Sequence, residues 1–137
     1  MKLKKRIASM GTAVMMAVSM MSVNASALLK TWENGTCRIT SYTSATSSNV
    51  YSNGSVVNKS GKAKYSIKTE VYYITTGNKY ANTANNLWKT ATLSKNSSLS
   101  GYQGSTPRYL NYKYSSYTQV MRSNAPYKTV QSDYAKI

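Results

Sequence analysis

The sequence contains no histidine, no phenylalanine, one cysteine and only three acids, Glu33, Glu70 and Asp133. Zinc sites require clusters of His, Cys or carboxylate groups, and general acid–base catalysis ordinarily requires His or a pair of carboxylates. The three acids are far apart in the sequence, and each lies in a different segment. The composition therefore predicts a protein that is not an enzyme and that holds no metal or other cofactor. An enzyme of this composition would need a Ser, Tyr or Lys nucleophile that works without such partners.

The single cysteine and the missing phenylalanine also constrain how the chain is stabilised. Cys37 has no partner in the sequence, so an intrachain disulfide is excluded, and it is either a plain, partly buried thiol or a bridge to another chain. Val, Ile, Leu and Trp are thinly spread, so the 13 Tyr must supply much of the buried area, each with a hydroxyl that needs a partner. A half-polar core of this kind suits thin sheets better than a helix bundle.

The first 27 residues have the pattern of a secretory signal peptide. A basic start is followed by an apolar stretch, Ile7–Val23, and by the small residues Ala25-Ser26-Ala27 that a signal peptidase recognises. A membrane anchor is the alternative, but the stretch is shorter than the ~20 residues that a bilayer requires and is diluted by Gly11 and Thr12. We therefore expect export, of the type seen in Gram-positive bacteria, and a mature chain, Leu28–Ile137, that forms one domain without a transmembrane segment.

Positive charge is the largest surplus in the sequence. Of the 18 Lys and Arg, 14 lie after residue 27 against three acids, which gives the mature part a net charge of about +11. A charge of this size on a small domain steers it toward polyanions. Bacterial envelopes offer teichoic acids, acidic phospholipids and pyrophosphate-linked wall precursors. Nucleic acid is a poor main candidate for an exported protein, although charge alone predicts nonspecific binding to it.

The clearest structural element is Lys62–Thr75. Its odd positions are mainly apolar and its even positions begin with charged residues, a period of two that is typical of a half-buried strand. Lys62, Lys64 and Lys68 should then lie along one face of the strand, joined by Lys59 from the preceding turn. Such a row could neutralise several phosphates at once, whereas a solvated face without a specific partner is the alternative.

A second feature is Asn49–Asn58, which has Asn53-Gly54 at its centre. Asn-Gly accepts positive φ at both turn positions and favours a tight hairpin. We therefore expect Val50-Tyr51 and Val56-Val57 to flank a turn, and Ser55–Asn58 to form a second hairpin with the long strand. A bulge within one longer strand is the alternative.

The remaining segments complete the predicted domain. Arg38–Thr43, Leu87–Leu93 and Tyr109–Met121 are predicted as strands, whereas Asn96–Pro107 is rich in Ser, Gly and Asn and is typical of a loop. Residues 122–137 form either an edge strand or a loose basic tail. No internal repeat and no heptad pattern is visible. The patterns together predict an all-β fold of about six to eight short strands, a small antiparallel β-sandwich, with a partly closed barrel as the alternative.

Two tryptophans and one Tyr-Lys-Tyr run add aromatic candidates for a binding surface. Trp32 could anchor a ligand or pack against the domain, and packing between sheets is the simpler explanation for Trp88. Lys113, between Tyr112 and Tyr114, combines a cation with rings that suit sugars and membrane interfaces. The candidate residues for binding an anionic target are Lys59, Lys62, Lys64, Lys68, Trp32 and Lys113.

A series of short motifs follows along the mature chain: Thr31-Trp32-x-x-Gly35, Tyr42, Val56-Val57-Asn58 with Gly61, Trp88-x-x-Ala91-Thr92 and Tyr112-Lys113-Tyr114. In residue type and order these motifs resemble the lactococcin 972 family of secreted bacteriocins. The chain departs from the family pattern in lacking His, in an insertion between Gly61 and Trp88, and in continuing beyond Tyr114. The resemblance implies a small antiparallel β-sandwich that acts on competing bacteria.

Charge and resemblance together predict a secreted cationic bacteriocin-like protein that acts without catalysis at the cell envelope of competing bacteria. Its expected partner is an anionic envelope component: a wall precursor, a teichoic acid or an acidic lipid. The alternative function is an exported binding or structural module for anionic cell-wall polymers on the producer's own surface.

Overall fold

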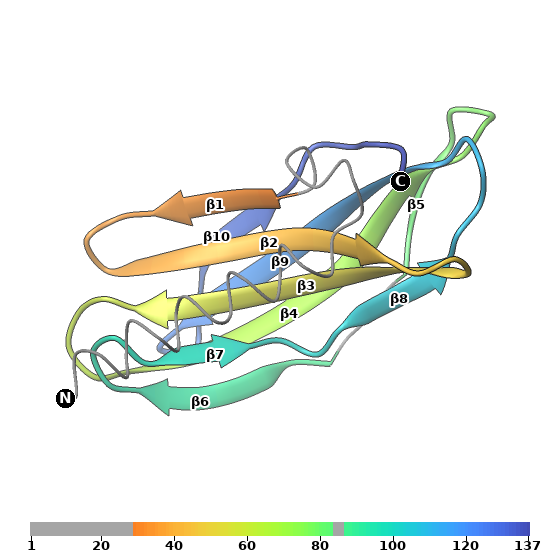
Figure 1. The fold of residues 1–137 in the computed structure, drawn as a ribbon. Helices are drawn as coiled ribbons and strands as arrows, with labels where there is room; N and C mark the ends of the chain where they lie inside the picture. The colour runs from red at the N-terminus through yellow and green to blue at the C-terminus, as the bar shows by residue number, and fades with distance from the viewer. Residues whose placement is uncertain (1–28, 84–86) are drawn as a thin grey trace, which may run out of the picture.

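The computed structural model describes residues 29–83 and 87–137, so the predicted signal peptide lies outside the described residues (Figure 1). The described chain is all-β, which confirms the predicted fold class. Its ten strands are β1 (Leu29–Glu33), β2 (Cys37–Ala45), β3 (Asn49–Asn58), β4 (Ala63–Ile74), β5 (Tyr80–Asn82), β6 (Lys89–Leu93), β7 (Ser98–Ser100), β8 (Gly104–Pro107), β9 (Lys113–Arg122) and β10 (Ala125–Gln131). No helix among the described residues is long and apolar enough to cross a membrane.

The strands form two antiparallel five-stranded sheets that pack face to face (Figure 1). Sheet A has the order β1-β2-β3, and β7 and β8 pair with the two halves of β3. Sheet B has the order β10-β9-β4, and β6 and β5 pair with the two halves of β4. In each sheet, one side of a long strand, β3 or β4, is therefore covered by two short strands.

Strand β4 has the predicted alternation. Tyr65, Ile67, Thr69 and Val71 are buried between the sheets, and Lys64 on the even-numbered face is exposed. The large buried side chains form two clusters, one around Tyr65 and Ile67 and a smaller one around Val71. The predicted half-buried strand is therefore confirmed, together with the face that it buries.

Small hydroxyl side chains also contribute to the interior between the sheets. Ser41 is buried and its Oγ donates to the Oγ of Ser116 at 2.7 Å, while the Oγ1 of Thr118 donates to Ser41 at 2.8 Å. Because buried hydroxyls need partners, these residues satisfy one another across the sheets. A chain poor in large apolar residues thus completes its core with hydrogen-bonded Ser and Thr.

The expected hairpin at Asn53-Gly54 is wrong. Strand β3 runs without interruption through Gly54, in continuous register with β2, so the alternative of a bulge is also not observed. Gly54 faces the interior, where an added Cβ would lie 2.5 Å from the Oγ1 of Thr69 and closer still to that of Thr118. The glycine therefore serves close sheet-to-sheet packing rather than a turn.

Other expectations need correction. The predicted second hairpin, between Ser55–Asn58 and the long strand, does not form, because β3 lies in sheet A and β4 in sheet B. The expected loop Asn96–Pro107 contains the short strands β7 and β8. For residues 122–137, the predicted edge strand is confirmed as β10, Ala125–Gln131, which pairs with β9. Short segments such as these raise the number of strands to ten.

Candidate functional site

Four connections between strands meet at one end of the sandwich, at the left in Figure 1. They join β1 to β2, β3 to β4, β6 to β7 and β9 to β10. We call this the hairpin end and define it as residues 33–38, 58–64, 94–97 and 122–124. Backbone hydrogen bonds connect these segments: Lys59 N–H donates to Thr36 O (2.9 Å), Asn58 N–H to Ser97 O (3.0 Å), and Ser123 N–H to Lys64 O (2.9 Å).

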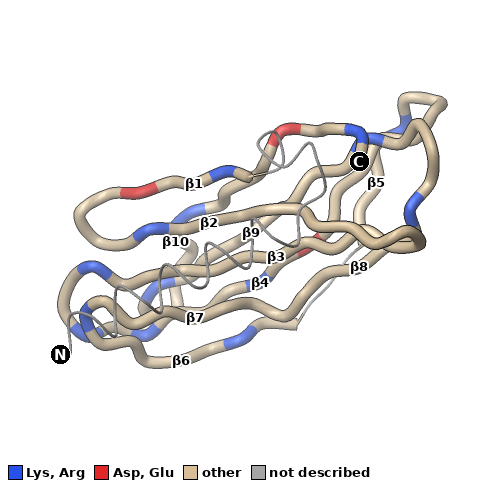
Figure 2. The backbone as a smooth tube through the Cα atoms, in the orientation of Figure 1, with Lys and Arg blue, Asp and Glu red and all other residues tan. Residues whose placement is uncertain are grey.

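The hairpin end carries a concentration of positive charge (Figure 2). Its only acid is Glu33, since the other two acids, Glu70 and Asp133, lie within β4 and after β10. Its cations are Arg38, Lys59, Lys62, Lys64, Lys95 and Arg122. Three of the predicted residues, Lys59, Lys62 and Lys64, are therefore brought together, and Lys95, Arg38 and Arg122 join them from other turns.

Sequence reasoning missed Arg38, Lys95 and Arg122. Each stands close to a turn-forming stretch, such as Asn34-Gly35 or Ser123-Asn124, and this was the available signal. However, the sequence does not state which turns share an end, because that depends on pairing between distant strands.

Lys59 is engaged in an ion pair with Glu33, which joins the β3–β4 turn to the β1–β2 hairpin. The hydrogen bond from Lys59 lowers the pKa of Glu33 below its ordinary value of 4.5. Lys62, Lys64 and Lys95 are exposed. These three lysines are therefore the most accessible cations of the hairpin end, whereas Lys59 is paired with Glu33.

Asn58 holds the hairpin end together from within. Its side chain is completely buried, and its amide donates to the carbonyls of Gly61 and Leu93, each at 3.0 Å. Its Oδ1 accepts from the Tyr65 hydroxyl at 3.0 Å. The Tyr65 hydroxyl in turn accepts from Arg122 Nε at 3.2 Å. One buried amide thus fixes the β3–β4 turn, the end of β6 and, through Tyr65, Arg122.

Lys68 lies apart from this end, on the outer face of sheet B. Its Nζ is 3.3 Å from Glu70 Oε1 and 5.1 Å from the ring centre of Trp88, and its side chain is 14% exposed. The Lys68 ammonium group is therefore engaged by Glu70 and Trp88 of the protein itself. The contact also shows that Trp88 lies on the outer face of the sheet, which corrects the expectation that it packs between the sheets.

Trp32 and Lys113 are also outside the cationic cluster. Trp32 lies edge-on to Tyr127 with ring centres 6.1 Å apart, and Lys128 lies over its ring at 5.0 Å, so it packs at the edge of the sandwich. Lys113 is paired with Ile74 at the far end of β4. At about 3.3 Å per residue it is roughly 33 Å from Lys64 along the strand. The six predicted residues therefore do not form one surface.

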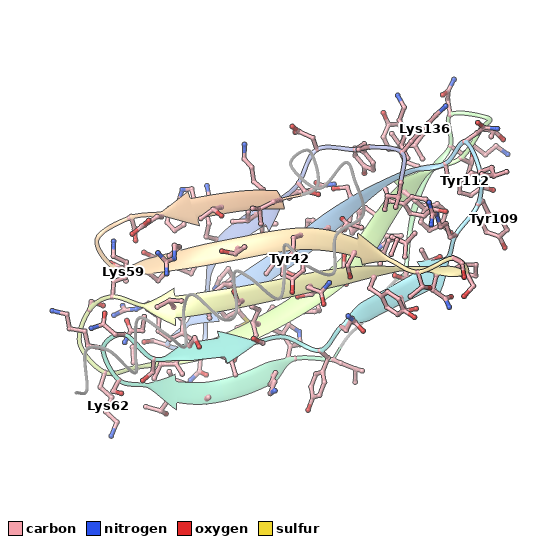
Figure 3. All side chains as sticks on the ribbon, in the orientation of Figure 1. Tyr42, Lys59, Lys62, Tyr109, Tyr112 and Lys136 are labelled. Carbon is pink, nitrogen blue, oxygen red and sulfur yellow. The ribbon has the colours of Figure 1, made fainter. Side chains whose placement is uncertain are left out.

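The positions that carry the family resemblance have mixed roles. Gly35 lies in the β1–β2 turn, where Asn34 Oδ1 accepts the backbone N–H groups of Thr36 and Cys37. Tyr42 lies on the outer face of sheet A, in the middle of β2 (Figure 3). Of the remaining positions, Thr31 is exposed, Val56 and Val57 are buried, Asn58 bonds Gly61, and Ala91 packs against the core.

Burial raises several pKa values, and this predicts loss of stability at alkaline pH. The pKa of Cys37 lies above its ordinary 9.0, those of Tyr42, Tyr65 and Tyr114 lie above 10.0, and that of Tyr72 is raised to about 12. The folded protein therefore keeps protons that the unfolded chain releases. This stabilisation is complete below about pH 9 and is lost as the pH rises toward 12.

We expect Tm, followed by circular dichroism, to fall continuously between pH 9 and 12. The Tyr72→Phe variant should lose less over this interval, because it lacks the hydroxyl whose pKa is raised to about 12. A Tm that stays constant into this alkaline range would contradict the assignment.

The acids do not gather into one place, since Glu33 is paired with Lys59, Glu70 with Lys68, and Asp133 follows β10. Among the described residues, no three His, Cys, Asp or Glu side chains form a group that could hold a metal ion. The hairpin end presents accessible ammonium groups on a framework of hydrogen-bonded turns. No family model matches this chain, and no curated protein matches it at a significant level.

Proposed function

We propose that this protein is a secreted cationic bacteriocin, similar to the lactococcin 972 family, that acts without catalysis at the envelope of competing bacteria. In this proposal the hairpin end binds an anionic envelope component, such as a teichoic acid or a phosphorylated wall precursor. The observation that carries the proposal is the collection of six cations against one acid at that end.

The geometry of the hairpin end suits a target with repeated negative charges. Lys62, Lys64 and Lys95 are exposed and come from two separate segments, the β3–β4 connection with the start of β4 and the β6–β7 turn. Several phosphates can therefore be contacted at once, whereas a single exposed charge pair contributes little. Because these contacts are exposed, salt should weaken them.

The framework beneath the lysines is already ordered. Asn58 fixes the connections around it, and the Lys59–Glu33 pair holds the neighbouring hairpin. Binding to such a surface requires little ordering of the backbone, which favours affinity. Only the lysine side chains have to lose conformational freedom.

We expect the double variant Lys62→Glu, Lys64→Glu to require at least about tenfold more protein to inhibit a sensitive strain, because reversed charges remove the attraction to an anionic surface. The matched control is Lys30→Glu, Lys89→Glu, which makes the same change of charge at two other exposed lysines, in β1 and β6. Minimal inhibitory concentrations against a panel of Gram-positive strains, measured with exported protein purified from the medium, make the comparison.

Two results would contradict the proposal. The first is an absence of inhibition by the unaltered protein across the panel, and the second is equal activity of the two double variants. If the protein instead stays on the producing cells and is released by high salt, the alternative function is supported, a module that binds the producer's own wall polymers.

A further inference from the structure

The opposite end of the sandwich carries a second surface of different chemistry. We call it the loop end and define it as residues 46–48, 75–80 and 108–113 with the C-terminal residues 133–137. Arg108 connects these segments: its backbone N–H donates to Ser48 O (2.9 Å), its Nη1 to Thr46 O (2.9 Å) and its Nη2 to Ile137 O (2.6 Å). The Arg108 side chain therefore forms hydrogen bonds within the protein and holds these segments together.

Leu110 lies in the β8–β9 connection, which we call the tip of this end, and is 87% exposed, the highest value among the large apolar residues that the structure describes. It lies in a turn in which Tyr112 N–H donates to Tyr109 O at 3.4 Å and Asn111 has a φ of 71°. Asn is one of the few residues that accept this left-handed conformation readily, so Asn111 suits the turn. The fold does not require a leucine next to Asn111, because the Leu110 side chain is almost entirely in solvent.

The turn is held in place by tyrosines (Figure 3). The backbone N–H of Tyr109 donates to the Tyr114 hydroxyl at 2.7 Å, and that hydroxyl donates to Pro107 O at 3.2 Å. The Tyr112 ring lies 5.0 Å from that of Tyr109 and is stacked on Tyr73 at 6.0 Å. Leu110 is thus presented on a preformed support.

Exposed lysines accompany the apolar tip. Lys113 follows the turn and pairs with Ile74, Lys79 precedes Tyr80, which pairs with the same Ile74, and Lys136 follows Ala135, the bridge partner of Tyr114. Tyr80 is itself 72% exposed. Asp133 is the one acid of the loop end. The end therefore combines an apolar tip, exposed tyrosines and an excess of positive charge.

We propose that the loop end docks on a lipid bilayer that contains anionic phospholipid, with Leu110 and Tyr109 entering the interface. Leucine gains by leaving water, and tyrosine favours the boundary between headgroups and acyl chains. Lys79, Lys113 and Lys136 complement the negative headgroups.

A highly exposed leucine next to an exposed tyrosine, Tyr109, suits a soft lipid interface. A stable protein partner would require a broad complementary surface instead. The inference depends on the proposed function only for its setting at a cell envelope, and the membrane contact itself is tested separately.

The direct test places a polarity-sensitive fluorophore at the tip. Cys37 is the only cysteine and is completely buried, so Leu110→Cys offers one accessible thiol for labelling. With vesicles of two parts phosphatidylcholine and one part phosphatidylglycerol, we expect a blue shift, and quenching by lipids spin-labelled near the headgroup. The same label at Gly61→Cys, an exposed position of the hairpin end, should remain in water.

Vesicle sedimentation gives the second measurement. Leu110→Ser should reduce partitioning into the mixed vesicles about tenfold. The matched control Leu87→Ser removes another exposed leucine, located before β6 and away from the tip, and should partition as the unaltered protein does. Vesicles of phosphatidylcholine alone should bind more weakly, because they lack the negative headgroups.

The inference is overturned if the label at position 110 stays in water, if Leu110→Ser partitions normally, or if the label at position 61 is the one that becomes shielded. Shielding at position 110 without any growth inhibition would leave this inference standing and refute the proposed function. Growth inhibition that depends on Lys62 and Lys64, with no shielding at position 110, would support the proposed function and refute this inference.

Discussion

Replacing Gly54 by Ala should destabilise the protein by about 3 kcal/mol, or prevent it from folding, because the new methyl group overpacks the interface between the sheets. The methyl would lie 2.5 Å from Thr69 Oγ1 and closer still to Thr118 Oγ1. Both threonines are buried on β4 and β9 of the opposite sheet, so relief would require the sheets to move apart. Urea unfolding followed by circular dichroism measures the loss.

Gly61→Ala is the matched control for this prediction. It makes the same chemical change at an exposed position where an added Cβ meets nothing within 4 Å. Both substitutions reduce the freedom of the unfolded chain in the same way, so the difference between them reports the packing at Gly54. We expect Gly61→Ala to change the free energy of unfolding by no more than about 0.5 kcal/mol. Equal stability of the two variants would show that the sheets are not closely packed at Gly54.

Asn58→Ala should have the second large effect, a loss of about 3 kcal/mol in the free energy of unfolding. The substitution leaves the carbonyls of Gly61 and Leu93 and the hydroxyl of Tyr65 without the partner that Asn58 provides. Buried polar groups that lose their partners bear a large part of their desolvation cost, and the Leu93 carbonyl and the Tyr65 hydroxyl are affected together. The same urea titration measures this variant.

Asn53→Ala provides the comparison for Asn58. Asn53 lies on the same strand, but its amide and carbonyl bond Ser44 and Gln103 on the outer face, where water can replace them. We expect it to cost no more than about 1 kcal/mol. The backbone N–H of Asn96, which donates to Asn58 O, should also exchange faster with solvent in Asn58→Ala, since the hairpin end is loosened. Two asparagine variants of equal stability would refute a central role for Asn58.

How far the sequence predicts the fold is clearest in β4 and β3. The alternation in Lys62–Thr75 is a local property of an extended chain, and it correctly predicts the strand Ala63–Ile74 and its buried face. The Asn53-Gly54 pair is also local, but it is compatible with a turn and with close packing. Thr69 and Thr118 determine that Gly54 serves close packing and not a turn. They lie next to Gly54 only because the two sheets pack against each other.

The candidate site, too, has features that local sequence determines and features that only tertiary packing determines. The excess of Lys and Arg over acids is a sum over residues, so the sequence alone determines that the protein is strongly cationic. The run Lys59–Lys64 could likewise be recognised as a basic turn and strand start. The separation of Lys68 and Lys113 from it could not, because their neighbours Glu70, Trp88 and Ile74 are set by packing and strand pairing.

The sequence by itself determined the all-β class, the buried face of the long strand and the large positive charge, because each depends on residue type and short-range spacing. Only the tertiary structure decided which turns meet, and hence that Arg38, Lys95 and Arg122 join Lys62 and Lys64 at one end while Leu110 projects from the other. The physical reason is that antiparallel pairing and the packing of two sheets join segments that are distant in the chain, and local side-chain patterns do not encode those partners.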